Sequence, residues 1–295
     1  MSGSFQIGDH RHTAPPLEPG LYIVATPIGN LRDITLRALE TIAACDLLAC
    51  EDTRMTRRLL DRYAIAQKPI AYHEHNADKA GATLLKALEE GQSVAIVSDA
   101  GTPLLSDPGY RIVVDARAAG LRVIPLPGPS ALTAALSASG VPTDNFRFCG
   151  FLPAKEKARN DALNALSNEA CTLIFYEAPG RLTKTLNAIS AIYGADRPVV
   201  VARELTKQFE TILADKAGDM TSHFAAGTVK GEIVVLVAPG AQAPLDWDGA
   251  QVDALLEELI TEMPAAKAAK VAAAQTGWSR ADLYDRLLAL KSDGQ

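Results

Sequence analysis

Cysteine is scarce in this sequence and shows no spacing that suggests a disulfide framework. The four cysteines of the 295-residue chain are Cys45, Cys50, Cys149 and Cys171, and no two of them form a CxxC pair. This usage indicates reduced thiols, as in cytosolic proteins. Cys45 and Cys50 lie among apolar residues, which favours small core residues over catalytic nucleophiles.

Long apolar runs and a net positive charge are also missing. No run reaches the roughly 18 apolar residues of a membrane span, and the amino terminus lacks the apolar core of a signal peptide. We therefore expect a soluble cytoplasmic protein without a membrane partner. The net charge is −6, so contact with nucleic acid would have to use a local basic patch. The length and the 48% hydrophobic content predict a substantial core and about two domains.

The dinucleotide-binding pattern GxGxxG is absent where an α/β fold would carry it. The first predicted strand, Leu21–Ala25, is followed by TPIGNLR, which contains the single glycine Gly29. A pyrophosphate cradle is therefore not supported, and neither NAD nor a P-loop nucleotide is expected. The loop can be an ordinary strand-to-helix turn or the floor of a pocket for a ligand without phosphates. We favour the pocket because two similar loops follow.

Apolar strands alternate with helices through the first half of the chain. Residues 1–20 contain three prolines and little apolar periodicity, and we expect a disordered extension. Strands are then predicted at Leu21–Ala25, Leu47–Cys50, Ile70–His73, Val94–Val97 and Arg122–Pro125. The helices between them predict a doubly wound parallel sheet over residues 21–138, with Asp33 capping the first helix.

Three loops rich in glycine and proline leave this sheet. They are Thr26–Arg32, the stretch SDAGTPLLSDPG after Val97, and Pro125–Ala131. Ligands of open α/β sheets bind beyond the carboxyl ends of the strands, where these loops would converge. We therefore predict one binding site there, with Ser106–Gly109 bracing the following helix.

A charged run, Glu51–Arg54, leaves a strand at the same edge. Asp52 or Thr53 can be a simple helix cap, or the run can bind a polar substrate, with Arg54 suited to a phosphate; the two interpretations are equally supported. His73 and His75 have a spacing compatible with a metal ion, but no third ligand is evident and we expect no metal.

The second half of the chain predicts a mixed sheet in an α+β domain over residues 139–243. Its strands are predicted at Phe146–Cys149, Leu173–Tyr176, Val199–Ala202, Thr211–Ala214 and Glu232–Val237. Polar residues follow two of these strands, at 175–181 and 203–207. Placed opposite the loops of the first domain, they would complete an interdomain cleft.

Residues 249–295 form a helical tail after a linker. A turn at Thr276–Gly277 separates two helical patterns, and Ser279 caps the second. This layout is typical of a helix-turn-helix.

The loops together resemble one family. The resemblance rests on LYIVATPIGNLRDITLRALE, CEDTRMT, VAIVSDAGTPLLSDPGY, VIPLPGPSALTAAL, GFLPAK, LIFYEAPGRL, VARELTKQFET and KGEIVVLV, in this order from Leu21 to Val237. The sequence is similar to the ribosomal RNA small subunit methyltransferase I family, part of the tetrapyrrole methylase superfamily (class III methyltransferases). The resemblance implies two α/β domains with S-adenosylmethionine between them and a homodimer. It also implies 2′-O-methylation of a cytidine ribose in the decoding region of 16S ribosomal RNA, within the small ribosomal subunit.

The resemblance also implies the residues that contact the cofactor. They are Pro27, Asp99, Ala100, Gly101, Thr102, Pro103, Ser130, Ala131, Phe175, Tyr176 and Leu205, with Gly231–Glu232 as further candidates. A ligand without phosphates agrees with the missing GxGxxG pattern.

Methyl transfer to a ribose hydroxyl depends on alignment and gains from a general base or a cation. Candidate bases are Glu51, Asp52, Glu177 and Glu204, and candidate cations are Arg54, Arg203 and Lys207. The sequence does not rank them.

Two other functions stay open at this point. One is a related methyltransferase acting on a tetrapyrrole precursor or a modified histidine, which the EDTR and YEAPGR segments disfavour. The other is a DNA-binding regulator that uses the tail. The tail's basic residues can contact RNA, or the helices can act only as a structural clamp. These residues are Lys267, Lys270, Arg280, Arg286 and Lys291.

Overall fold

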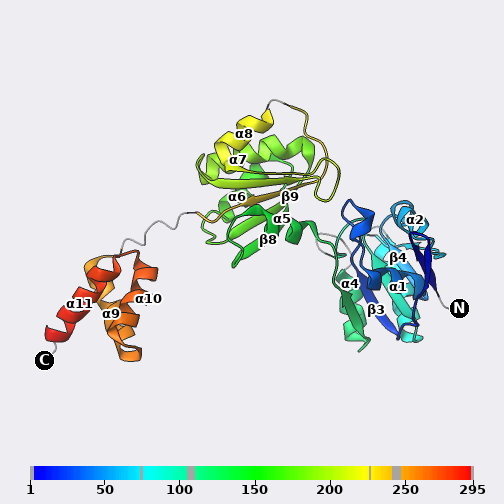
Figure 1. Ribbon diagram of the computed structural model, residues 1–295, viewed down its shortest axis with the longest axis horizontal. Helices are drawn as coiled ribbons and strands as arrows, with labels where there is room; N and C mark the ends of the chain where they lie inside the picture. Colours follow the sequence, from blue (N-terminus) through cyan, green and yellow to red (C-terminus); the bar gives the residue numbers. More distant parts are fainter. Residues whose placement is uncertain (1–2, 74–75, 105–109, 226, 241–246, 294–295) are drawn as a thin grey trace. The chain divides into compact units, whose positions relative to one another are not determined.

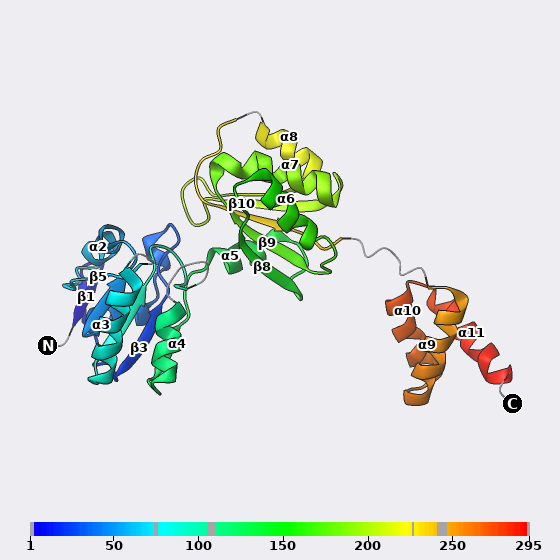
Figure 2. The same cartoon turned by 180° about the vertical axis from the view of Figure 1, so that it is seen from behind.

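The computed structural model describes residues 3–73, 76–104, 110–225, 227–240 and 247–293. The chain divides into two compact units. The first comprises residues 1–167 and 171–238, and the second comprises residues 168–170 and 239–295. Figures 1 and 2 show the elements of each unit from opposite sides.

The first unit begins with a parallel five-stranded sheet in the order β5-β4-β6-β3-β7. Its strands are β3 (Gly20–Val24), β4 (Leu47–Cys50), β5 (Ile70–Ala71), β6 (Ser93–Val97) and β7 (Val123–Leu126). Helices α1 (Leu36–Ala44) and α2 (Thr53–Arg62) cover one face, and α3 (Ala77–Glu89) and α4 (Tyr110–Ala118) cover the other. This confirms the doubly wound parallel sheet.

Residues 4–13 form regular secondary structure, which corrects the expectation of a disordered extension. Strands β1 (Ser4–Ile7) and β2 (His10–Thr13) form an antiparallel hairpin. The Phe5 side chain is only 3% exposed and packs into the core beside α1 and α2. Gln6 donates its backbone N–H to the carbonyl of Tyr63 at 2.7 Å. One buried aromatic ring and a Gly8 turn (φ +59°) are enough to fix a segment whose average composition is polar.

The start of the first helix also differs from the prediction. Thr35 is the N-cap of α1, and its side chain accepts the backbone N–H of Ala38 at 3.1 Å. Asp33 lies instead in a short 3-10 turn, Leu31–Asp33 (η1). Asp52 is confirmed as the N-cap of α2.

The second sheet is mixed, as predicted, in the order β11-β10-β12-β9-β8. Its strands are β8 (Phe146–Phe151), β9 (Thr172–Glu177), β10 (Pro198–Arg203), β11 (Thr211–Lys216) and β12 (Ile233–Val237). Only β8 and β9 pair in parallel. Helices α6 (Glu156–Ala165), α7 (Leu182–Tyr193) and α8 (Ala217–Ala225) cover one face, with a 3-10 turn, Pro179–Arg181 (η3), before α7.

Helix α5 (Ala131–Ser139) packs against the other face of the second sheet. The sequence pattern instead predicts a first domain that extends to residue 138 and includes most of this helix. Leu132, Ala135 and Leu136 of this helix share a core with β10 and β12 because its apolar side faces those strands. The passage from one sheet to the other therefore precedes α5.

The second unit is a three-helix domain. It consists of α9 (Gly249–Glu262), α10 (Ala265–Thr276) and α11 (Arg280–Asp293) around a core that includes Leu256, Ala272 and Leu283. Helix α10 is followed by Gly277, whose φ of +73° favours glycine. Asp248 begins α9 with a capping box. The predicted helix-turn-helix corresponds to α10 and α11, and α9 completes its core.

None of the helices in the described part of the chain combines the length and apolar character needed to cross a membrane.

Candidate functional site

Hydrogen bonds join the three predicted loops at the carboxyl edge of the first sheet. Thr26 and Gly101 exchange both backbone hydrogen bonds at 2.9 Å, which joins the loop after β3 to the loop after β6. The Ser98 hydroxyl donates to the carbonyl of Gly101 at 2.9 Å. The Thr102 hydroxyl donates to the carbonyl of Pro129 at 3.3 Å and reaches the loop after β7. The loops therefore form one wall, as the sequence predicted.

Glycine allows the close packing within this wall. A Cβ atom on Gly128 would lie 2.8 Å from the Cβ atom of Ala25, at the end of β3. Gly101 has a φ of +80°, and a Cβ atom there would lie 3.3 Å from the Ile28 side chain. A larger residue at either position would push the loops apart.

A cavity of about 350 Å³ lies between this wall and the second sheet of the same unit. Its volume is in the range of small-molecule sites, about 300–1,000 Å³. The residues that line it are Ile28, Ala100, Gly101, Thr102, Ser130, Ala131, Phe151, Tyr176, Glu177, Ala178, Pro179, Leu205, Gly231, Glu232, Ile233 and Val234.

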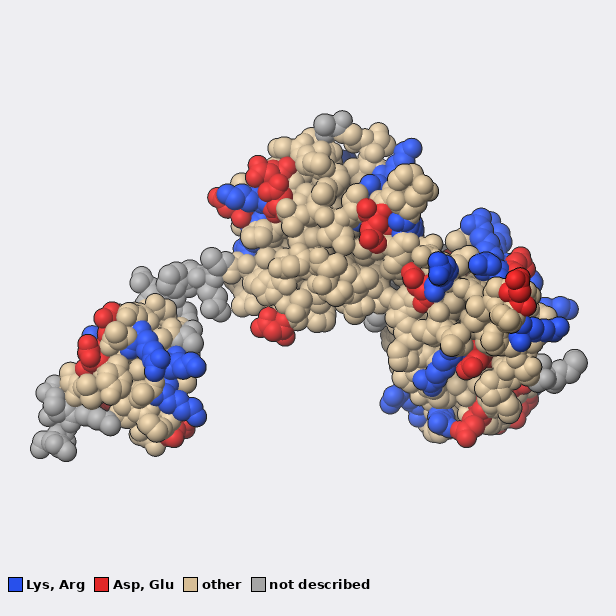
Figure 3. Space-filling view, in the orientation of Figure 1, with Lys and Arg blue, Asp and Glu red and all other residues tan. Residues whose placement is uncertain are grey.

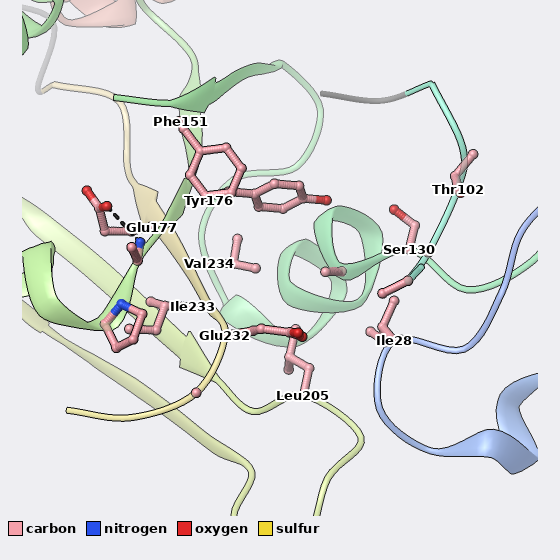
Figure 4. A pocket seen from close by; sticks show the side chains of 16 residues that line it. Ile28, Thr102, Ser130, Phe151, Tyr176, Glu177, Leu205, Glu232, Ile233 and Val234 are labelled. Atoms are coloured by element: carbon pink, nitrogen blue, oxygen red, sulfur yellow. Dashed lines mark hydrogen bonds between the residues drawn. The ribbon is translucent and has the colours of Figure 1, made fainter. Parts of the chain in front are cut away.

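The two sides of the cavity differ in chemistry. Figure 4 shows Thr102 and Ser130 on one side and the rings of Phe151 and Tyr176 on the other. The Tyr176 ring contacts Phe151 edge-to-face, with centroids 5.7 Å apart. Val234 and Leu205 add apolar surface, and Glu232 adds a carboxylate. Such a site can hold a flat ring beside the aromatic side chains and bind a polar group through a few oxygens.

The predicted cofactor contacts fall into four groups. Seven of them line this cavity: Ala100, Gly101, Thr102, Ser130, Ala131, Tyr176 and Leu205. Pro27 and Asp99 line a neighbouring cavity instead. Pro103 lies beside a small hollow near Glu51. The Phe175 side chain is fully buried in the core on the α7 side of the sheet, because neighbouring residues of a strand point to opposite faces.

Several lining residues were not assigned from the sequence. Ile28, Phe151, Ile233 and Val234 belong to this group. Phe151 is 57% exposed although it is a large aromatic residue, and it lies in the GFLPAK segment that carried the family resemblance. The GFLPAK segment was therefore the feature of the sequence that could have identified Phe151 as a lining residue. Gly231 and Glu232, which were further candidates, do line the cavity.

A second cavity of about 330 Å³ adjoins the first. It shares Ile28, Ala100 and Glu232 with the first cavity. Its remaining lining residues are Thr26, Pro27, Gly29, Leu31, Met55, Thr56, Arg58, Leu59, Ser98, Asp99 and Lys207. Two molecules can therefore bind next to each other, with their contact near the shared residues.

Asp99 is one of two carboxylates that line the second cavity, together with Glu232. One of its oxygens accepts the backbone N–H of Asp52 at 3.0 Å. Burial is the main influence on this group and raises the pKa of Asp99. The family resemblance implies that Asp99 contacts the cofactor, and in the structure Asp99 lines the cavity next to the predicted cofactor cavity.

Lys207 lies on the same wall within a cluster of two carboxylates. Its ammonium is 2.9 Å from Oε1 of Glu204 and 3.2 Å from Oε2 of Glu232. Burial acts to lower the pKa of Lys207, but the hydrogen bonds to Glu204 and Glu232 outweigh it, so the pKa is raised. The Lys207 hydrogen bond lowers the pKa of Glu204, with help from the Glu232 N–H. Lys207 therefore stays charged.

The segment that carries this cluster has an uncommon backbone. Glu204 and Thr206 have φ values of +53° and +66°, which are costly for residues other than glycine. Thr206 accepts the backbone N–H of Asn30 at 3.1 Å and so connects this segment to the loop after β3. A Cβ atom on Gly29 would lie 2.5 Å from the Lys207 side chain. These contacts fix Lys207 against the first domain.

The other predicted carboxylates have structural partners. Glu177 is 3% exposed, and its oxygens accept hydrogen bonds from the Ala178 N–H, Arg181 and the Thr185 hydroxyl. In Figure 4 its carboxylate points toward Ala178 and away from the cavity. Asp52 is fixed by Arg54, whose guanidinium and backbone N–H lower the pKa of Asp52 to about 2. Both carboxylates thus stabilise turns at strand ends.

The remaining candidates lie apart from the two cavities. Arg203 donates to Oγ1 of Thr211 at 3.2 Å and to the carbonyl of Lys230 at 3.2 Å. Glu51 lines the small hollow with Pro103. His75 lies outside the described residues, as does the segment Ser106–Gly109 that is expected to brace α4. Among the described residues, no group of three or more histidine, cysteine and acidic side chains has a metal-binding arrangement.

In the helical unit, some of the predicted basic residues are exposed and one is held in an ion pair. Lys267, Lys270 and Arg280 are exposed. Arg286 instead forms an ion pair with Asp253 and donates to the carbonyl of Gly249 at 3.1 Å. The Lys291 side chain lies outside the described set.

Comparison with known proteins places this fold in a class. Residues 20–221 match the family model described as Tetrapyrrole (Corrin/Porphyrin) Methylases, and residues 246–291 match the RsmI C-terminal HTH domain. A solved structure of uroporphyrin-III C-methyltransferase from Thermus thermophilus, complexed with S-adenosylhomocysteine, is similar in fold. Its TM-score is 0.53 at 16% identity, and the match covers 75% of this chain and 97% of that chain.

Two curated relatives narrow the class. The chain is 55% identical to ribosomal RNA small subunit methyltransferase I of Mesorhizobium japonicum over 97% of both chains. It is 49% identical to the protein of that name in Escherichia coli O157:H7, over 90% of this chain and 93% of the relative. The chain therefore belongs to the ribosomal RNA small subunit methyltransferase I family of the tetrapyrrole methylases.

Proposed function

We propose that this ribosomal RNA methyltransferase transfers a methyl group from S-adenosylmethionine to the ribose 2′-hydroxyl of a cytidine in the decoding region of 16S ribosomal RNA. The observation that carries the proposal is the 55% identity, over 97% of both chains, to a protein named for small-subunit ribosomal RNA methylation. The two adjoining cavities support it, because a transfer reaction needs a donor and an acceptor in contact.

The first cavity fits S-adenosylmethionine. Phe151 and Tyr176 offer aromatic surface to an adenine ring, and the open backbone around Gly101 and Ala131 allows close approach of the ligand. The described residues that line the cavity form no glycine-rich phosphate cradle, which agrees with a nucleoside that carries no phosphate. The similar fold that holds S-adenosylhomocysteine adds support. When bound, the cofactor supplies an activated methyl group on a positively charged sulfur.

The second cavity suits the acceptor nucleotide. Leu31, Met55 and Leu59 provide apolar surface for a base, and Arg58 and Lys207 provide positive charge for a phosphate. A nucleotide would have to turn out of its stack to enter such a space. The shared residues Ala100 and Glu232 then mark where the ribose meets the first cavity.

Asp99 and Lys207 are the groups we assign to the reacting hydroxyl. A ribose hydroxyl is a weak acid, so a nearby carboxylate that accepts its proton favours attack by the oxygen. Asp99 lines the acceptor cavity, and burial raises its pKa, which makes it a better base than an exposed aspartate. The Lys207 ammonium, fixed by Glu204 and Glu232, can stabilise negative charge on the oxygen or on the neighbouring phosphate.

The proposed reaction is tested by identifying the methylated nucleoside. Purified protein is incubated with S-adenosylmethionine and small ribosomal subunits that lack the modification, and the RNA is digested for mass spectrometry. We expect one 2′-O-methylcytidine per subunit, at a position that resists alkaline hydrolysis. Methylation of a base, or of a tetrapyrrole precursor with no transfer to RNA, would refute the proposal.

A further inference from the structure

Helix α2 presents a row of arginines to solvent. Thr56, Leu59 and Leu60 are buried and anchor the helix in the first core. Every other residue from Arg54 to Arg62 is exposed. Of these exposed residues Arg54, Arg57, Arg58 and Arg62 are basic, whereas Asp61 is the single acidic one. We call these four arginines the α2 basic face. Figure 3 shows lysine and arginine side chains gathered over α2.

Most of this positive charge is uncompensated. Arg54 forms an ion pair with Asp52 at 2.7 Å. Arg57 donates to the Gln67 carbonyl at 3.4 Å, and the Arg62 guanidinium lies 5.8 Å from the Tyr63 ring centroid. Within the described part of the chain, no carboxylate lies in ion-pair distance of Arg57, Arg58 or Arg62. In a chain with a net charge of −6, such a cluster is a local exception.

The row also leads to the acceptor cavity. Arg54, Arg58 and Arg62 follow each other at intervals of four residues, which corresponds to a rise of roughly 6 Å along a helix. Arg58 lines the second cavity together with Met55 and Leu59 of the same helix. A polyanion that lies along α2 therefore reaches the cavity mouth.

From this arrangement, we propose that the α2 basic face binds the phosphate backbone of the RNA strand that carries the acceptor nucleotide. The inference rests on the proposed function, since it presupposes an RNA acceptor in the second cavity. Arginine suits this role because its planar guanidinium forms paired hydrogen bonds with phosphate oxygens. Such contacts give affinity and register but little sequence information, which the cavity itself would supply.

The helical unit is a weaker candidate for the same contact. Its exposed Lys267, Lys270 and Arg280 share their unit with acidic residues on α9 and α11, and Arg286 is engaged by Asp253. Binding through α10 is therefore the alternative that an experiment must separate from binding through α2.

The experiment compares three double variants of the full chain. Arg57→Gln/Arg62→Gln removes two charges from the α2 basic face without altering a cavity residue. Lys86→Gln/Arg117→Gln removes two charges from the last turns of α3 and α4, and Lys267→Gln/Lys270→Gln removes two from α10. The dissociation constant for unmodified small subunits is measured at several KCl concentrations, and the affinity for S-adenosylmethionine is measured by calorimetry.

We expect Arg57→Gln/Arg62→Gln to weaken subunit binding about tenfold or more and to reduce the slope of log K against log salt by about 1 to 2. The α3/α4 variant keeps the wild-type affinity and slope, and all three bind S-adenosylmethionine normally. The inference is overturned if the α2 variant keeps the wild-type slope of log K against log salt. It is also overturned if only the α10 variant loses affinity for the subunit. The proposed function stands in both cases. If the wild-type protein transfers no methyl group to RNA, the proposed function itself fails.

Discussion

At the scale of single residues, glycines decide how closely charged side chains approach the cofactor cavity. The Glu204 carboxylate lies over Gly231, where a Cβ atom would be only 2.3 Å from it. Glu204 also fixes Lys207 and accepts the Glu232 N–H at 3.0 Å. The absence of a side chain at Gly231 therefore allows Glu204 to hold Lys207 and the Glu232 backbone beside the two cavities.

Gly231→Ala should displace the Glu204 carboxylate and with it Lys207. The backbone strain at φ +91° adds to the clash. We expect the affinity for S-adenosylmethionine to fall about tenfold, or about 1.4 kcal/mol, as measured by calorimetry. Gly91→Ala is the matched control, because Gly91 also has a positive φ of +81° but has open space around it. Equal losses of affinity in the two variants would contradict the role of the Glu204 clash.

Asp99→Asn separates catalysis from cofactor binding. Because we assign Asp99 as the base, we expect this substitution to slow single-turnover methyl transfer about 10²-fold or more. The affinity for S-adenosylmethionine should change little. The wild-type rate should also fall with decreasing pH as the carboxylate becomes protonated, at a pH above the ordinary value of 3.8 because burial raises its pKa. Loss of cofactor affinity in parallel with rate would instead support the original assignment of Asp99 to the cofactor.

At the scale of elements, buried strands were the most predictable features. The core of β6, Val94–Val97, is a continuous apolar run, and the predicted bounds agree with the structure to within one residue. The hairpin of β1 and β2 was missed because β2 is exposed along its whole length and only Phe5 of β1 is buried. One anchoring ring leaves almost no periodic signal in a sequence.

Phe5→Ala should therefore destabilise the first unit while leaving its chemistry intact. The ring is 3% exposed in the core beside α1 and α2, so we expect a loss of about 3 kcal/mol in the free energy of unfolding. Urea denaturation measures this, and cofactor affinity should be unchanged. His10→Ala, at an exposed position of β2, should cost less than about 0.5 kcal/mol. A comparable effect of both substitutions would contradict the anchoring role of Phe5.

Strand geometry alone predicts the side of the candidate site that the first sheet provides, whereas Tyr176 and Leu205 on the opposite side were named as cofactor contacts through the family resemblance. Parallel strands direct their carboxyl ends to one edge, so Gly101 and Ser130 could be placed together from the sequence. The opposite side depends on a mixed sheet whose strand order a sequence does not reveal. Val234 and Tyr176 lie on the face of this sheet that α5 covers, whereas Phe175 and Val235 lie on the opposite face, because neighbouring residues of a strand point to opposite faces.

At the scale of the whole molecule, all residues of both cavities belong to the first unit. A chain that ends after residue 247 keeps all of these residues, so it should bind S-adenosylmethionine within about twofold of the full-length affinity. A twofold change corresponds to about 0.4 kcal/mol. Calorimetry on the two proteins measures this. A tenfold loss in the shortened chain would show that the helical unit takes part in cofactor binding.

Methyl transfer to the small ribosomal subunit tests the central claim most directly. Radioactive S-adenosylmethionine is supplied with subunits that lack the modification, and label is counted in 16S ribosomal RNA for the wild-type protein and for Asp99→Asn. We predict that the wild-type protein incorporates about one methyl group per subunit, on a cytidine 2′-oxygen, and that the variant incorporates it far more slowly. Absence of label in the RNA with the wild-type protein, while S-adenosylmethionine binds normally, would contradict the account.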